Sequence, residues 1–296
     1  MDGSPDNQEP KRVLTRRDFL HRAAQHTGIL GITALAGSLA QKNADKKPKP
    51  SPPPLSLQSS PAVNPVLAKE KIQAPQQVEE IFFKNFSSTE RALAEEKIAT
   101  QIMHYSDQYG QVLKADRVLD WEKTTLKPIL KLDVPSQNHQ FWSELLPAVM
   151  YLESEGKNMA ESEAKAFGLT QLTESTAQET ANKHGKLKFD LRIGWDNLRL
   201  SRFCLEDLID RYGTDIFLLG YYAGSGFTDS KILTALAKKG VDKQDSIMEK
   251  GISSNQQLRL YIDHYRINIF NLGSEDGMEY LTKTVAAMRI LREVRG

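Results

Sequence analysis

An apolar stripe at helical spacing is the feature that most constrains this 296-residue chain. The stripe lies within residues 141–155, and its members fall at i, i+3, i+4, i+7, i+8 and i+11: Trp142, Leu145, Leu146, Val149, Met150 and Glu153. Only the last of them carries a charge. Burial at the end of such a stripe favours the protonated carboxyl group, which is the form that a general acid needs. A glutamate that turns out to solvent at the helix end is the other interpretation of this position.

Helical periods continue through most of residues 76–296, and little strand alternation accompanies them. We therefore predict a mainly α protein, with a helical accessory segment over 76–140 and a main domain over 141–296. Within that domain, Ser175 and Gln178 have the spacing of a capping box and predict the start of a helix.

The N-terminus has the pattern of an export signal. Arg16 and Arg17, followed by Asp18-Phe19-Leu20, precede an apolar run from Gly28 to Leu39. That run is too short to cross a bilayer, which takes ~20 residues. We predict a signal peptide of the twin-arginine type over 1–40, with an uncleaved N-terminal anchor as the alternative.

Residues 41–75 are rich in Pro, Lys and Ser, and we predict a disordered linker there. Together with the signal, this organisation predicts an exported protein of the periplasm or cell envelope. No transmembrane domain is expected once the signal has been cleaved.

Charge and composition exclude several classes of function. Residues 1–60 hold nine Lys/Arg and five Asp/Glu, whereas the remaining residues hold 30 and 33. The predicted folded part is therefore not basic, and we expect no nucleic-acid partner. Cys204 is the only cysteine, so no intrachain disulfide can form. His104, His139, His184 and His264 have no ligand-spaced partner nearby, and we predict no metal site and no cofactor.

Several short blocks occur in a fixed order beyond the apolar stripe. They are Glu153-Ser154, Ser162, Gly168-Leu169-Thr170-Gln171, Thr176-Ala177, Asn197-Leu198 with Leu205, and Gly220-Tyr221-Tyr222-Ala223-Gly224-Ser225-Gly226. In this order and spacing, residues 146–226 resemble the catalytic domain of soluble lytic transglycosylases, which share the lysozyme-like fold. Tyr280 fits a tyrosine that the family carries at the head of a later helix.

The resemblance implies a lytic enzyme that acts on peptidoglycan glycan strands. The family cuts the β-1,4 bond between N-acetylmuramic acid and N-acetylglucosamine and closes a 1,6-anhydro ring on the muramyl product. By resemblance, Glu153 is the catalytic acid and base. Five further side chains are expected to bind the substrate or to orient the acid: Ser154, Gln171, Tyr221, Tyr222 and Tyr280. An envelope protein or a secretion machine is a possible further partner.

The chain also departs from the family pattern. Glycine is usual where Lys165 and Ser201 stand, and methionine where Thr170 stands. The family has a substrate-facing asparagine in place of Tyr222, so this departure puts the sugar contacts in question.

Two other functions stay open. A lysozyme-type hydrolase on the same fold would need a second carboxylate in most cases. Glu155 points about 200° around the helix from Glu153 and is predicted to be a rim residue, which leaves Glu161, Glu163 and Glu174 as candidates. A non-catalytic protein that binds or assembles the cell wall is the third interpretation.

Overall fold

A computed structural model describes residues 75–105, 108–241 and 255–296. All described residues belong to one compact unit. The signal peptide predicted over 1–40 and all but the last residue of the predicted linker lie outside the described residues, so both stay predictions. Within the described ranges, no helix is both long enough and apolar enough to cross a membrane.

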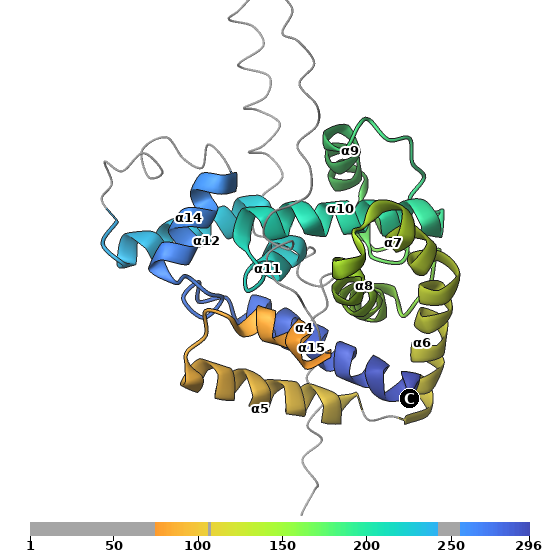
Figure 1. Cartoon of the computed structure of the whole chain (residues 1–296), viewed down its shortest axis with the longest axis horizontal. Coiled ribbons are helices and arrows are strands. Elements are labelled where there is room, and N and C mark those ends of the chain that lie inside the picture. The colour runs from red at the N-terminus through yellow and green to blue at the C-terminus, as the bar shows by residue number, and fades with distance from the viewer. Residues whose placement is uncertain (1–74, 106–107, 242–254) are drawn as a thin grey trace, which may run out of the picture. The chain divides into compact units, whose positions relative to one another are not determined.

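The described part is mainly helical, which confirms the predicted fold class (Figure 1). Its first half holds α4 (Pro75–Glu80), η1 (Ile81–Phe83), α5 (Ser88–His104), α6 (Gln108–Trp121), the π-helix η2 (Glu122–Leu126), α7 (Lys127–Asp133) and η3 (Ser136–Asn138). The rest holds α8 (His139–Ser154), β1 (Ala166–Phe167), β2 (Leu172–Thr173), α9 (Glu174–Lys183), α10 (Gly194–Tyr212), α11 (Phe217–Ala223), α12 (Ser225–Lys238), α14 (Asn255–Tyr265) and α15 (Glu275–Arg295).

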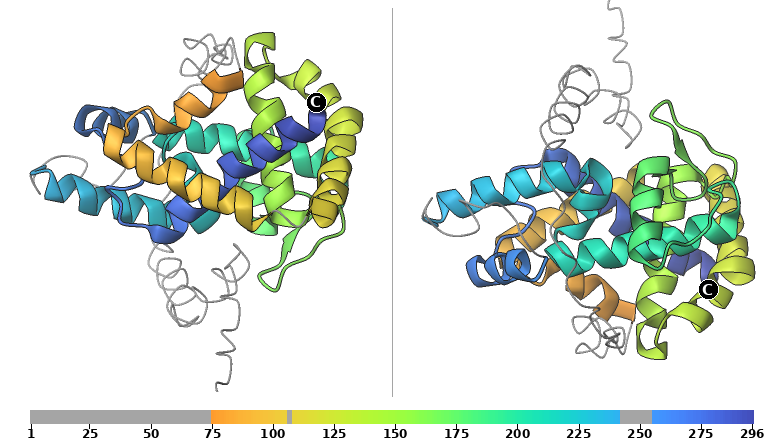
Figure 2. Two further views of the ribbon diagram at one scale, coloured as in Figure 1. Left: turned by 90° about the horizontal axis from the view of Figure 1, so that it is seen from below. Right: turned by 90° about the horizontal axis from the view of Figure 1, so that it is seen from above.

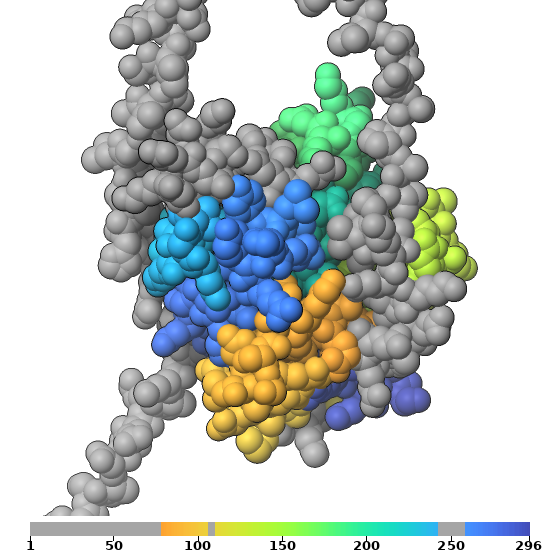
Figure 3. Space-filling view, turned by 60° about the vertical axis from the view of Figure 1, so that its left-hand side comes forward, coloured from red at the N-terminus to blue at the C-terminus, as the bar shows by residue number. Residues whose placement is uncertain are grey.

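The C-terminal helix α15 joins the two halves of this unit. It packs against α5, α6, α8 and α11, which come from positions far apart in the chain (Figures 1 and 2). Ser274 caps the helix, because its Oγ accepts a hydrogen bond from the Gly277 amide at 3.1 Å. On the face shown in Figure 3, the orange N-terminal helices lie directly against the blue C-terminal elements.

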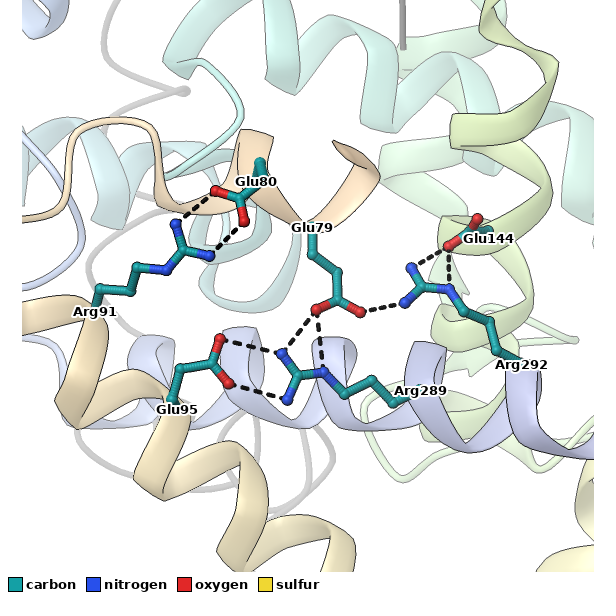
Figure 4. A network of polar contacts seen from close by, with 7 residues as sticks. All are labelled: Glu79, Glu80, Arg91, Glu95, Glu144, Arg289 and Arg292. Carbon is teal, nitrogen blue, oxygen red and sulfur yellow. Dashed lines mark hydrogen bonds and ion pairs between the residues drawn. The ribbon is translucent and has the colours of Figure 1, made fainter. Parts of the chain in front are cut away.

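Arginines of α15 hold this arrangement through a network of ion pairs (Figure 4). Arg289 binds Glu79 of α4 at 2.8 Å and Glu95 of α5 at 3.0 Å. Arg292 binds both Glu79 and Glu144 of α8. Only 8% of Glu79 and 6% of Glu144 are exposed, so these two carboxylates depend on the arginines for the hydrogen bonds that water would otherwise give.

Helix α8 is more buried than its sequence pattern indicates. The apolar members of the predicted stripe are buried as expected, with Trp142 1% exposed and Met150 fully buried, whereas Glu153 at its end is half-buried. The opposite side, which the pattern assigns to polar positions, is buried as well and includes Glu144, Tyr151 and Ser154. The physical reason is that α15, α6 and α10 also pack on α8.

A proline inside α8 leaves one backbone acceptor without its helical donor. Pro147 has no N–H, so the Ser143 carbonyl four residues earlier receives no bond from within the helix. The Arg295 Nη2 atom of α15 donates to this carbonyl at 2.7 Å. The C-terminal helix therefore satisfies a group that the sequence of α8 alone leaves unpaired.

Helix α9 begins two residues earlier than the capping-box pattern predicts. Thr173 is its N-cap, and the Thr173 Oγ1 atom accepts from the Thr176 amide at 3.3 Å. Ser175 therefore lies inside the first turn, and the predicted start there is wrong. Thr173 is the N-cap instead, because it ends β2 with extended backbone, which is the conformation that an N-cap needs.

Candidate active site

Glu153 lies at the last turn of α8, where the helix leaves the core. The helix ends because Glu155 takes the left-handed conformation, with φ of 55°. Glu153 is half-buried, and its Oε1 atom accepts a hydrogen bond of 2.6 Å from the Tyr280 hydroxyl of α15. The structure thus brings together an acidic group and a phenol that are 127 residues apart in sequence.

A second tyrosine supports this pair from α11. The Tyr222 ring stacks on the Tyr280 ring, with ring centroids 5.0 Å apart and planes inclined by 28°. Tyr222 is 3% exposed and Tyr280 is 5% exposed. Glu153 of α8, Tyr280 of α15 and Tyr222 of α11 are therefore linked by two successive contacts.

Three other predicted site residues contact one short backbone segment, Gly168–Gln171, which joins β1 to β2. The Ser154 hydroxyl donates to the Leu169 carbonyl at 2.7 Å. The Tyr221 hydroxyl donates to the Thr170 carbonyl at 2.6 Å. The Gln171 side chain donates to the Gly168 carbonyl at 2.9 Å and to the Ala160 carbonyl at 3.0 Å. These side chains fix the position of the turn.

The turn itself needs a glycine at its first position. Gly168 has φ of 76°, a conformation that side chains disfavour. A Cβ atom there would also stand 2.3 Å from the Asn197 side chain and 2.5 Å from the Leu191 carbonyl oxygen. Asn197 instead uses this space to donate to the Phe167 carbonyl at 2.9 Å. Helix α10 is thereby tied to the β1–β2 hairpin.

Two of the departures from the family pattern meet in space. The Thr170 hydroxyl donates to Asn197 Oδ1 at 2.8 Å and is hydrogen-bonded to the Ser201 hydroxyl. All three side chains are fully buried. Thr170 is smaller than the family's methionine and Ser201 is larger than the family's glycine, so together they fill about the same buried volume. Their hydroxyl groups have hydrogen-bond partners within it. The sequence shows a smaller residue than usual at position 170 and a larger one at position 201. No sequence pattern indicates that these two side chains are in contact.

Glu155 is held by two lysines. Its carboxylate lies 2.7 Å from Lys114 Nζ and 2.9 Å from Lys157 Nζ. Burial raises the pKa of Glu155, but the hydrogen bonds and charges of the two lysines outweigh it and the pKa falls below its usual value. Glu155 therefore stays ionised and is poorly suited to donate a proton.

The other three candidate carboxylates, Glu161, Glu163 and Glu174, are exposed. Glu161 forms an ion pair of 2.7 Å with Lys165. Glu174 is the first residue of α9, where its charge favours the helix dipole. Both thus have local structural roles.

Comparison with known proteins identifies a family over part of the chain. Residues 132–242 match the family described as the transglycosylase SLT domain. The match spans α8, the hairpin and α11, and so includes Glu153 and Tyr222, whereas Tyr280 of α15 lies beyond it. No curated protein matches the chain. Residues 132–242 therefore form a transglycosylase SLT domain of the lysozyme-like superfamily.

Proposed function

We propose that this protein is a peptidoglycan lytic transglycosylase in which Glu153 is the general acid and base. At the level of the family, the SLT domain indicates glycan cleavage of the lytic transglycosylase type. The observation that carries the proposal is the half-buried Glu153 at the end of α8, with the Tyr280 hydroxyl 2.6 Å from its Oε1 atom. A carboxyl group so placed is held in a fixed position and is still close enough to the surface to exchange a proton with a bound glycan.

The reaction follows from one carboxyl group. Protonated Glu153 gives its proton to the glycosidic oxygen as the bond from that oxygen to C1 of N-acetylmuramic acid breaks. The acetamido group of the same sugar stabilises the positive charge at C1, so the enzyme needs no nucleophilic carboxylate. Ionised Glu153 then takes the proton of the C6 hydroxyl as O6 bonds to C1. The acid is restored, and no water enters the product.

The surroundings of Glu153 support a single-carboxylate mechanism over hydrolysis. Glu155 is fixed by two lysines, and Glu161 is paired with Lys165. A retaining hydrolase would need a second carboxyl group at ~5–5.5 Å from the acid and an inverting one at ~6.5–9.5 Å. On α8 itself, Glu144 lies nine residues before Glu153, or about 13 Å along the axis, and is bound to Arg292.

Product analysis tests this function. We expect the purified protein to release 1,6-anhydromuramyl products from isolated sacculi, each lighter by one water than the hydrolysis product and without a reducing end. Glu153→Gln keeps the size of the side chain but cannot donate a proton, so the rate should fall by ~10²–10⁴-fold. Glu155→Gln is the matched control and should keep most of the activity. Reducing-end products would identify a lysozyme-type hydrolase, and no product from folded protein would favour a wall-binding role.

The substrate class makes export part of the same proposal, because peptidoglycan lies outside the cytoplasmic membrane. We propose that the signal over residues 1–40 directs the protein to the periplasm and that the mature chain begins near Gln41. Replacing Arg16 and Arg17 with Lys should leave a precursor in the cytoplasm. N-terminal sequencing of protein from the envelope decides between cleavage and a retained anchor.

A further inference from the structure

Tyr222 is the side chain whose place in the site differs most from the family pattern. A family member has an asparagine here that faces the substrate, whereas Tyr222 is 97% buried in this structure. Helix α11 presents two consecutive tyrosines in different directions. Tyr221 reaches the hairpin turn, and Tyr222 lies flat against Tyr280. The ring of Tyr222 thus contacts the residue that binds Glu153.

The contact with Tyr280 matters because of what Tyr280 does. Its hydroxyl donates to Glu153 Oε1 at 2.6 Å, and hydrogen bonds to a carboxylate weaken steeply when the donor moves or tilts. A tyrosine has two freely rotating side-chain bonds, and a stacked neighbour removes much of that freedom. Without the Tyr222 ring, a void of ring size would open beside Tyr280 and allow its hydroxyl to leave the carboxylate.

We propose that Tyr222 is a positioning residue of this chain, which acts through Tyr280 to hold the hydrogen bond on Glu153. In this role its aromatic ring matters and its direct reach toward the sugar does not. The inference rests on the proposed function of Glu153 as the acid. It assigns to Tyr222 a role different from that of the asparagine in other family members.

Two substitutions separate the ring from the hydroxyl. Tyr222→Phe keeps the stacked ring and should therefore lose less of kcat than a variant without the ring. Tyr222→Leu removes the stack and should lower kcat by about 10- to 100-fold, the range expected for one hydrogen bond to a charged group. KM should change little, because in the proposed role Tyr222 acts through Tyr280 and not through the substrate. Phe141→Leu removes a buried ring from the far end of α8 and serves as the cavity control, with stability lowered and kcat kept.

The dependence of the rate on pH tests the hydrogen bond between Tyr280 and Glu153 directly. Removing a donor from a carboxylate favours its protonated form, so the alkaline limb of the rate profile should move to higher pH in Tyr222→Leu. Tyr280→Phe should move it in the same direction. In the double variant, the Tyr222→Leu substitution should have little further effect, because the bond that it supports is already absent. Additive effects, or a rise in KM alone, would overturn the positioning role.

One readout does not depend on activity. Crystal structures of the wild type and of Tyr222→Leu measure the distance from the Tyr280 hydroxyl to Glu153, which should exceed 3.5 Å in the variant. If that distance is kept, the positioning role is wrong, whatever the enzyme does. If the wild type releases no product from sacculi while the distance lengthens in the variant, the proposed function fails and the structural coupling stands.

Discussion

Substituting Arg292 tests how the C-terminal helix, and with it Tyr280, is held in place. Arg292→Met keeps a straight side chain of similar length but removes the charge and all of its hydrogen bonds. Glu79 would keep Arg289 as a partner (Figure 4). Glu144 would lose the only ion-pair partner that it has among the described residues.

The size of the effect follows from burial. The Glu144 side chain is 6% exposed and the Arg292 side chain is 23% exposed, so this pair is largely withdrawn from water. Removing one partner of a buried pair leaves an uncompensated charge and typically costs 3–5 kcal/mol. We take about 3 kcal/mol for this partly open pair. For a folded unit of this size, that lowers the melting temperature by about 6–12 °C.

Urea denaturation followed by circular dichroism measures the free energy of unfolding, and two controls sharpen it. Arg91→Met breaks the pair with Glu80, whose side chains are 40% and 53% exposed, and should cost less than about 1 kcal/mol. Adding Glu144→Leu to Arg292→Met removes the stranded charge, so most of the lost stability should return. The reasoning is refuted if Arg292→Met costs no more than Arg91→Met, or if the double variant is less stable than the single one.

Three further predictions concern other parts of the domain. Lys165 has φ of 57° where the family has glycine, so Lys165→Gly should raise stability by up to about 1 kcal/mol in thermal unfolding without loss of activity. Thr170→Met should lower the free energy of unfolding by about 2 kcal/mol. Ser201→Gly should destabilise the Thr170→Met variant less than it destabilises the wild type, because the two side chains occupy one shared volume. Burial raises the pKa of Asp215 to about 6, against the hydrogen bond from Asn85 that lowers it. The folded state therefore binds this proton more tightly than the unfolded state between about pH 4 and 6, and stability falls by up to about 3 kcal/mol as the pH rises through that window. Asp215→Asn should remove this loss, which appears as a difference between wild-type and variant unfolding at pH 4.5 and pH 7.

The position of Glu153 at the end of a buried helical stripe was open to prediction because it is a local property. A stripe of period 3.6 fixes which face of α8 is buried, and Glu153 lies on that stripe near the helix end. The mainly helical fold follows in the same way from local periods. The two strands, with two residues each, were too short to leave any alternation. The hairpin was therefore visible only through its turn residues, Gly168 to Gln171.

The hydrogen-bond partner of Glu153 was not open to prediction, because no local pattern encodes a contact across 127 residues. The resemblance supplied Tyr280 as a cleft residue but not its bond to Glu153, and it gave Tyr222 a role facing the sugar. The buried polar side of α8 has the same origin. From its sequence position alone, Glu144 is expected to be solvated. In the structure it is buried because Arg292, 148 residues later, binds it.

The departures from the family pattern follow a common physical rule. Thr170 and Ser201 are each unexpected alone, yet together they keep the buried volume and satisfy their hydroxyls. Tyr222 is unexpected as well, and its ring stacks on Tyr280. In both cases the departing side chain is buried and has a partner within the fold. Such changes leave in place the helix end that presents Glu153, and residues 132–242 still match the SLT domain family despite these departures.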